Sequence, residues 1–359
     1  MSILALETSC DDTCAAVIDW DGSVRANVIS SQTAHEDFGG VVPEIASRHH
    51  LELVNAIVER ALTDAGAALD DVELVAATQG PGLIGALLVG LSTAKALASA
   101  RELPFAPVDH LQGHVAANFL RAATGAGGTT PDGRPAEPFE PPFLCLIASG
   151  GHTLLTHVRE HDGFEVLGRT LDDAAGEAFD KGARMLGLGY PGGAALERLA
   201  RDGDAEAFVF PGSRGERAKG GRGASRQAFA EGLDFSFAGL KTALLYRLRD
   251  LSEDEARAQA ADLAASYQAA IVDSLVARAE RALAQSGLDR LAVGGGVAAN
   301  GALRARLARL GVELGIPPRE LCTDNAAMIA SAARYVEPIA YPGYLDLDVY
   351  ASGEAAPRA

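Results

Sequence analysis

Two histidines stand four positions apart in the stretch HLQGH, residues 110–114. In a helix this spacing places both imidazoles on one face, where they could bind a single metal ion. The zinc-protease version of the pattern, H-E-x-x-H, carries a glutamate that acts as general base, but Leu111 occupies that place here. The spacing of His110 and His114 therefore indicates either a metal site without a protease base or a helix in which two histidines pack.

A metal site built on two histidines needs further ligands, and Asp324 is a candidate. Asp324 and Asn325 also precede an apolar helical pattern, so either reading, ligand or helix cap, is open. Two histidines and one carboxylate with open positions are typical of zinc hydrolases and non-haem iron sites. Cys10 and Cys14 form a C-x3-C pattern, but no second Cys or His pair follows, which favours a structural role.

Glycine-rich turns recur at residues 80–85, 149–153, 190–193 and 294–300. Backbone N–H groups in such turns can bind phosphate or carboxylate oxygens, so the set favours a nucleotide or acyl-phosphate site over plain turns. None of them matches the Walker or the G-x-G-x-x-G pattern, which argues against P-loop and Rossmann enzymes.

A run of acidic residues lies between these turns. Asp173, Glu177 and Asp180 fall on one face of a predicted helix. This face is either solvated or, with Lys181, able to contact ribose hydroxyls or phosphate.

The composition bounds the class of protein. The chain has 359 residues, a net charge of −17, 48% hydrophobic and 22% charged residues, which suits a globular protein of about two domains. The acidic balance argues against a large basic nucleic-acid surface, so any RNA contact needs a local patch. The Gly/Arg-rich stretch 212–230 is a candidate for such a tRNA contact, or a flexible insertion; its charged residues are Arg214, Glu216, Arg217, Lys219, Arg222 and Arg226. We see no secretory leader and no apolar run of ~20 residues, and expect a cytoplasmic protein without a membrane segment.

The elements that must position these residues alternate between strands and helices. A strand–turn–strand pattern opens the chain and recurs at residues 143–160, after a Gly/Pro-rich linker at 123–142. This layout predicts a duplicated α/β architecture. The predicted helices cover Ile45–Ala65, the segment around the two histidines, Asp173–Leu186, Glu253–Ser286, and the segment after Thr323 or Asp324.

Taken together, the motifs resemble those of one family, the TsaD/Gcp group of tRNA adenosine threonylcarbamoyltransferases, once described as O-sialoglycoprotein endopeptidases. The matching segments, in order, are ALETSCDDT, FGGVVPEIASRHH, TQGPGLIGALLVG, HLQGH, ASGGHT, DDAAGEAFDKGARMLGLGYPGG, LDFSFAGLKT, GGGVAAN and CTDNAAMIA. Gln112 and Asp12 depart from the family, since many relatives have Glu at both places.

The resemblance implies an actin-like ATPase (ASKHA, sugar-kinase type) α/β fold of two duplicated domains with the active site between them. We expect a first domain at residues 1–138, completed by a C-terminal helix at about 324–350, and a second domain at 139–323.

The resemblance also implies the site residues. His110, His114 and Asp324 match the family's metal ligands, for one divalent iron or zinc ion per subunit. The substrate-binding positions that match are Ile147, Ala148, Ser149, Gly150, Gly151, Asp180, Gly193 and Asn300. Glu7, Thr8 and Ser9 align with the family's N-terminal turn, and no residue is assigned as general base.

The implied reaction transfers a threonylcarbamoyl group from threonylcarbamoyl-AMP to N6 of the adenine 3′ of the anticodon in tRNAs that read ANN codons. The implied partners are a TsaB-like paralogue and a TsaE-like ATPase. Two other classes are alternatives: a nucleotide-binding ATPase or assembly subunit, and a metalloendopeptidase. Leu111 counts against the endopeptidase, because a metal-bound water would lack its usual base.

Overall fold

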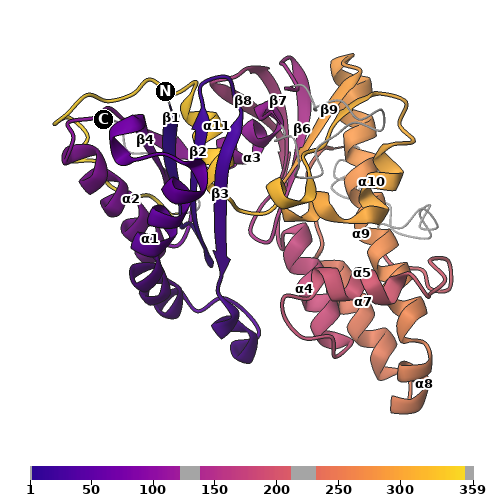
Figure 1. Cartoon of the computed structure of the whole chain (residues 1–359). Helices are drawn as coiled ribbons and strands as arrows, with labels where there is room; N and C mark the ends of the chain where they lie inside the picture. Colours follow the sequence, from indigo (N-terminus) through magenta and orange to yellow (C-terminus); the bar gives the residue numbers. More distant parts are fainter. Residues whose placement is uncertain (1, 122–137, 212–231, 352–359) are drawn as a thin grey trace. The chain divides into compact units, whose positions relative to one another are not determined.

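The computed structural model describes residues 2–121, 138–211 and 232–351, and these form two compact units (Figure 1). Unit 1 comprises Met1–Pro141, Arg159–Gly163 and Pro317–Ala359, and unit 2 comprises Pro142–Val158 and Phe164–Ile316. The domain boundaries at residues 138 and 323 stay a prediction. Within the described ranges, every helix is too short or too polar to cross a membrane.

Unit 1 is built on a five-stranded mixed sheet with the order β3-β2-β1-β4-β5. Its strands are β1 (Ser2–Glu7), β2 (Asp12–Asp19), β3 (Val24–Ser31), β4 (Val72–Gly80) and β5 (Phe105–Asp109). The first three strands form an antiparallel meander, whereas β4 and β5 run parallel to β1. The carboxyl ends of β1, β4 and β5 therefore lie along the same edge of the sheet.

Helices cover both faces of this sheet (Figure 1). The helices are α1 (Pro43–Ala65), α2 (Ile84–Ser99), α3 (His110–Ala116) and α11 (Ala326–Ala333), with 3-10 turns η1 (Thr33–Phe38), η2 (Leu69–Asp71), η3 (Ala117–Phe119) and η5 (Arg319–Leu321). Leu4 and Leu6 form a core with α1 and α2. Alternate residues such as Ile3 and Ala5 point to the opposite face, where α11 packs on β1 and against α3.

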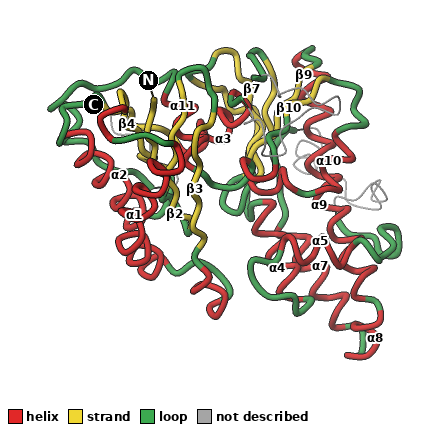
Figure 2. The backbone as a smooth tube through the Cα atoms, viewed as in Figure 1, coloured by secondary structure: helices red, strands yellow, loops and turns green. Residues whose placement is uncertain are grey.

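Unit 2 repeats the sheet with the order β10-β9-β6-β7-β8. Its strands are β6 (Phe143–Ala148), β7 (Thr153–Glu160), β8 (Gly163–Arg169), β9 (Arg290–Gly294) and β10 (Glu313–Gly315). Its helices are α4 (Ala175–Met185), α5 (Gly193–Ala200), α7 (Ala238–Arg249), α8 (Glu253–Ala258), α9 (Ala260–Ser286) and α10 (Gly301–Leu307), with the 3-10 turn η4 (Gly296–Ala299). The buried helix α9 packs against β6 and β9 and against α4, α5, α7 and α10 (Figure 2).

The two sheets confirm the predicted α/β fold with a duplicated strand order. Two helix predictions were wrong in extent. The helix predicted at about 324–350 ends at Ala333, because Pro338 and Pro342 cannot continue it and Ile339 instead bridges Phe105. The helix predicted at Glu253–Ser286 is interrupted at Gln259. The Gly/Arg-rich stretch 212–230 and most of the linker 123–142 lie outside the described residues.

Candidate metal centre

Helix α3 presents both histidines of HLQGH on one buried face. Asp109 caps the helix, since its Oδ1 accepts hydrogen bonds from the backbone N–H groups of Leu111 (2.8 Å) and Gln112 (3.1 Å). The ring centroids of His110 and His114 lie 4.7 Å apart, and both side chains are buried. Gly113 allows α11 to approach, because a Cβ atom there would lie 2.7 Å from Ile329 Cδ1.

Asp324 reaches the two histidines from the start of α11. Its Oδ1 lies 3.3 Å from His114 Nε2 and 3.7 Å from His110 Nε2. The cap of α11 is Asn325, whose Oδ1 accepts a hydrogen bond from Met328 N (3.0 Å). The prediction of Thr323 or Asp324 as the cap was wrong. The Asp324 carboxylate lies near the two histidines instead.

Glu7, at the end of β1, holds the other nitrogen of His110. Its Oε2 lies 3.0 Å from His110 Nδ1, and its carboxylate also accepts hydrogen bonds from Ser9 N and Thr78 Oγ1. With Nδ1 donating to Glu7, Nε2 is the His110 nitrogen that would bind a metal ion, which would take the place of the Nε2 proton. A carboxylate behind a metal-binding histidine fixes both its ring orientation and its tautomer.

The charges of this group act on one another through a buried environment. Burial disfavours the charged imidazole of His110, but the carboxylates of Asp324 and Glu7 outweigh burial and raise the pKa of His110 to about 9. Burial likewise disfavours ionised Glu7, but His110 outweighs it and lowers the pKa of Glu7 below its ordinary value. The two side chains therefore form a buried ion pair in the absence of a metal.

His114 provides a test of whether a metal ion fits. The imidazole is fully buried, yet neither ring nitrogen has a hydrogen-bond partner among the residues that the structure describes. A buried polar atom without a partner is costly, and a metal ion bound at Nε2 would remove that cost for one of the two nitrogens. The ligand atoms of His110, His114 and Asp324 all lie within 4.8 Å of one another, and two imidazoles with one carboxylate suit divalent iron or zinc.

The predicted substrate-binding residues all lie in unit 2. Ile147 and Ala148 end β6, and Ser149, Gly150 and Gly151 form the turn to β7. Strand β9 pairs in parallel with β6, with Ile147 opposite Gly294, so the glycine turn after β9 leaves from the same edge. Asn300 follows this turn and caps α10, with its Oδ1 accepting from Leu303 N (2.9 Å) and its Nδ2 donating to Gln268 Oε1 (2.8 Å).

Asp180 and Gly193 are joined directly. Asp180 Oδ1 accepts hydrogen bonds from the backbone N–H groups of Gly192 (2.8 Å) and Gly193 (3.2 Å), so this carboxylate holds the start of α5. Lys181 instead makes ion pairs with Asp173 and Glu177, at 2.8 Å each. Of the acidic residues predicted on one face, Asp180 therefore holds a turn, whereas Asp173 and Glu177 pair with Lys181.

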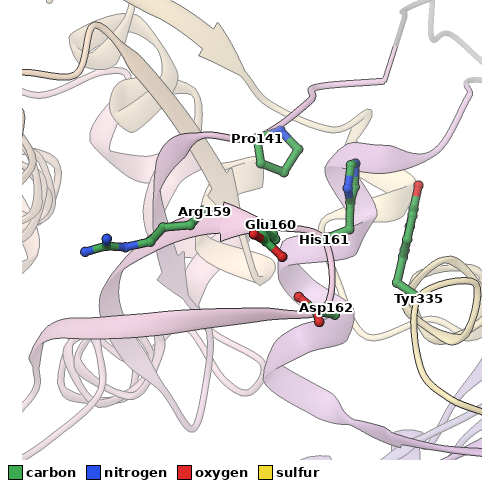
Figure 3. A pocket seen from close by; sticks show the side chains of 6 residues that line it. All are labelled: Pro141, Arg159, Glu160, His161, Asp162 and Tyr335. Atoms are coloured by element: carbon green, nitrogen blue, oxygen red, sulfur yellow. The ribbon is translucent and has the colours of Figure 1, made fainter.

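Gln112 connects α3 to a pocket of about 370 Å³ in unit 1 (Figure 3). Its Nε2 donates to the His161 backbone oxygen (2.6 Å), a bond that a glutamate at this position could not donate. The ring of His161 stacks on Tyr335 with centroids 4.3 Å apart, as Figure 3 shows. The lining residues are Pro141, Arg159, Glu160, His161, Asp162 and Tyr335, so the predicted metal ligands lie elsewhere in the unit.

Sequence reasoning did not find the roles of Glu7 and Asp109. Both residues end strands, and the parallel pairing of β1, β4 and β5 brings them to one edge with Thr78. The available signal was a polar residue directly after each predicted strand.

The chain is similar in sequence to proteins of one family. The profile of the family described as "TsaD: tRNA N6-adenosine threonylcarbamoyltransferase" matches residues 23–331. A "tRNA N6-adenosine threonylcarbamoyltransferase" of Clostridium botulinum (strain 657 / Type Ba4) is 46% identical over 341 residues, covering 93% of this chain and 92% of the relative. One of the same name from Clostridium perfringens (strain SM101 / Type A) is 46% identical over 338 residues, with the same coverage.

Solved structures with low sequence identity share the fold. Full-length HypF in its phosphate- and nucleotide-bound form superposes with a TM-score of 0.54 at 15% identity, covering 93% of this chain and 55% of HypF. Component A of (R)-2-hydroxyglutaryl-CoA dehydratase from Acidaminococcus fermentans gives a TM-score of 0.51 at 13% identity, covering 94% and 97% of the two chains. Both are proteins of the actin-like ATPase fold.

Proposed function

Because the chain belongs to the tRNA N6-adenosine threonylcarbamoyltransferase family, we propose that it makes N6-threonylcarbamoyladenosine in tRNA. The donor is threonylcarbamoyl-AMP, and the acceptor is the adenine immediately 3′ of the anticodon in tRNAs that read ANN codons. The N6 amine attacks the carbamoyl carbon, and the bond from this carbon to the phosphate oxygen breaks. AMP leaves with the electron pair while N6 loses one proton.

The observation that carries the proposal is a set of two histidines and one carboxylate, on a helix that lacks the glutamate of the protease motif. Leu111 stands in place of the protease glutamate, and Glu7 is already engaged by His110, Ser9 and Thr78. A peptidase needs a base to activate water. A mixed anhydride donor is already activated, so acyl transfer from it depends mainly on positioning.

In this proposal His110, His114 and Asp324 hold one divalent ion, iron with zinc as the alternative. A bound ion would supply positive charge that polarises an oxygen of the donor. Glu7 holds His110 through Nδ1, so that Nε2 is the nitrogen directed to the ion, and both histidines are buried.

We assign the donor to the turns of unit 2. The backbone N–H groups of the glycine turn at Gly150 and Gly151 are of the kind that bind phosphate and carboxylate oxygens, and Asp180 fixes the second turn through Gly192 and Gly193. Asn300 and Gly193, each next to one of these turns, complete the assignment. We further propose that a TsaB-like paralogue and a TsaE-like ATPase assist the reaction, and that it takes place in the cytoplasm with the tRNA pool.

The test is a direct assay. The purified protein is incubated with threonylcarbamoyl-AMP and unmodified ANN-reading tRNA, with and without the partner proteins, and the nucleosides are analysed by mass spectrometry. We expect N6-threonylcarbamoyladenosine with this tRNA and none with a matched tRNA that carries guanine 3′ of the anticodon. Failure to form product under every condition would overturn the proposal.

A further inference from the structure

The hydroxyl of Tyr350 reaches the residue that starts the metal-binding helix. It donates a hydrogen bond to Asp109 Oδ2 (2.6 Å) and lies 2.9 Å from the Gly80 carbonyl oxygen. Tyr350 is 4% exposed, and burial and the neighbouring Asp109 raise its pKa, so the phenol stays protonated as a donor.

The segment that carries Tyr350 is tied to the sheet of unit 1 at several points. Gln79 accepts a hydrogen bond from Tyr350 N (3.2 Å) and donates its side-chain amide to Asp348 O (2.8 Å). Lys95 Nζ, on α2, donates to the carbonyl oxygens of Leu345 (2.7 Å) and Leu347 (2.8 Å). A Cβ atom at Gly80 would lie 2.4 Å from the Tyr350 carbonyl oxygen, so the segment runs directly over the end of β4. The hydroxyl is therefore delivered at a fixed position.

Both oxygens of Asp109 are used. Oδ1 accepts the N–H groups of Leu111 and Gln112 and thereby begins α3, while Oδ2 accepts the hydroxyl of Tyr350. A carboxylate held on both sides cannot rotate away from the helix end. His110 is the first residue of that helix, and its ring is held at the other side by Glu7.

We propose that Tyr350 is a positioning residue for the metal-binding histidines, acting through Asp109. The inference rests on the proposed metal role of His110, His114 and Asp324. The hydroxyl does not contact the ligand atoms; it fixes the cap that sets where α3 begins, and one helical turn later the same helix carries His114.

The test substitutes Tyr350→Phe in the full-length protein and measures binding of Co²⁺ to metal-free protein by its visible absorption. Tyr344→Phe is the matched control. Tyr344 belongs to the same segment and is fully buried, but its hydroxyl has no hydrogen-bond partner among the described residues. Outer-shell partners of metal ligands typically contribute about 10- to 100-fold in affinity, so we expect about a tenfold loss for Tyr350→Phe and less than about twofold for Tyr344→Phe.

A double-mutant cycle separates positioning from general destabilisation. In an Asp109→Asn background, Tyr350→Phe should have little further effect on Co²⁺ affinity, because the carboxylate that it acts through is already changed. Hydrogen exchange of the metal-free protein gives a readout that needs no metal: the amides of Leu111 and Gln112 should exchange about tenfold faster in Tyr350→Phe and at the wild-type rate in Tyr344→Phe.

Three results would each overturn the inference. The first is equal Co²⁺ affinity in wild type and Tyr350→Phe, and the second is an equal loss of affinity in Tyr350→Phe and Tyr344→Phe. The third is an additive effect of Tyr350→Phe and Asp109→Asn on Co²⁺ affinity. A wild-type protein that does not bind Co²⁺ would overturn the metal role itself. In that case a changed exchange rate at Leu111 would still show that Tyr350 holds the cap, and the two failures are thereby distinguished.

Discussion

The two sheets have the same strand order and carry different chemistry at the same edge. In each, a strand pairs antiparallel with the strand that follows it and parallel with a later strand, β1 with β4 and β6 with β9. The strand ends of unit 1 bear the polar side chains of Glu7, Thr78 and Asp109, whereas those of unit 2 include Ala148 and Gly294. The strand ends of unit 1 therefore position polar side chains, whereas these two strands of unit 2 end in small residues.

The difference has a physical cause in how closely the turns pack. In unit 2 a Cβ atom at Gly295 would lie 2.4 Å from Ala148 O, and one at Gly176 would lie 2.5 Å from Ser149 O. Such contacts leave no room for a side chain at either glycine. The strand ends of unit 1 instead carry a carboxylate, a hydroxyl and a helix cap, and this set suits the support of a metal-binding histidine.

The largest expected effect is the loss of metal in His114→Ala. Outer-shell changes alone cost about 10- to 100-fold in affinity, so removing a ligand should cost more than about 100-fold and abolish threonylcarbamoyl transfer. Metal content and Co²⁺ titration check this. His157→Ala, a half-buried histidine on β7, is the control and should keep its metal. A His114→Ala protein with normal metal content would remove His114 from the ligand set.

The second prediction concerns the glycine turns of unit 2. Gly295 has a φ of +86°, and an added Cβ would meet the carbonyl of Ala148, so Gly295→Ala combines backbone strain with overpacking. We expect a loss of about 3 kcal/mol in the free energy of unfolding, measured by chemical denaturation. Gly150→Ala, where nothing lies within 4 Å of the added atom, should change stability by less than about 0.5 kcal/mol. Similar losses in both variants would argue against close packing as the reason for the glycines.

The third prediction tests the charged edge through Glu7→Gln. The amide keeps an acceptor for Ser9 N, but it removes the charge that faces His110 Nδ1. We expect about a tenfold lower affinity for Co²⁺, the lower end of the range for outer-shell carboxylates. Glu44→Gln, an exposed residue of α1, is the matched control. Wild-type affinity in Glu7→Gln would mean that the carboxylate does not orient His110.

Local patterns were enough to predict the strands and helices around the site. The strand–turn–strand repeat predicted both hairpins, and the spacing in HLQGH predicted histidines on one face of a helix. These features depend on residues a few positions apart. The third proposed ligand, Asp324, came from the family resemblance, since spacing alone left it as either a ligand or a cap.

The remaining contacts depend on pairings that a single sequence does not encode locally. Glu7 meets His110 across 103 positions because β1, β4 and β5 are parallel, and Tyr350 meets Asp109 across 241. The sequence could not tell whether Asn325 or Asp324 caps α11, because both residue types favour the cap position. The backbone conformation at each residue determines which one is the cap.

The smallest expected effect is that of Asp180→Asn, which tests whether Asp180 acts through its charge or by holding a turn of unit 2. Asp180 Oδ1 accepts two backbone N–H groups, and the amide oxygen of Asp180→Asn can accept the same two bonds. If Asp180 serves to hold the turn at Gly192 and Gly193, Asp180→Asn should raise the KM for threonylcarbamoyl-AMP by about threefold or less. Asp180→Ala loses both bonds, and because each is worth about 1 kcal/mol, it should raise the KM by up to about 30-fold.

Titration with AMP, which lacks the acyl group, checks that these changes reflect binding and not the transfer step. The two variants should keep the same order with AMP as with the donor. Equal and large losses in Asp180→Asn and Asp180→Ala would mean that the negative charge itself meets the donor. A charged side chain would then contact the donor in unit 2 as well. The contrast between the two units would be weaker than the glycine turns suggest.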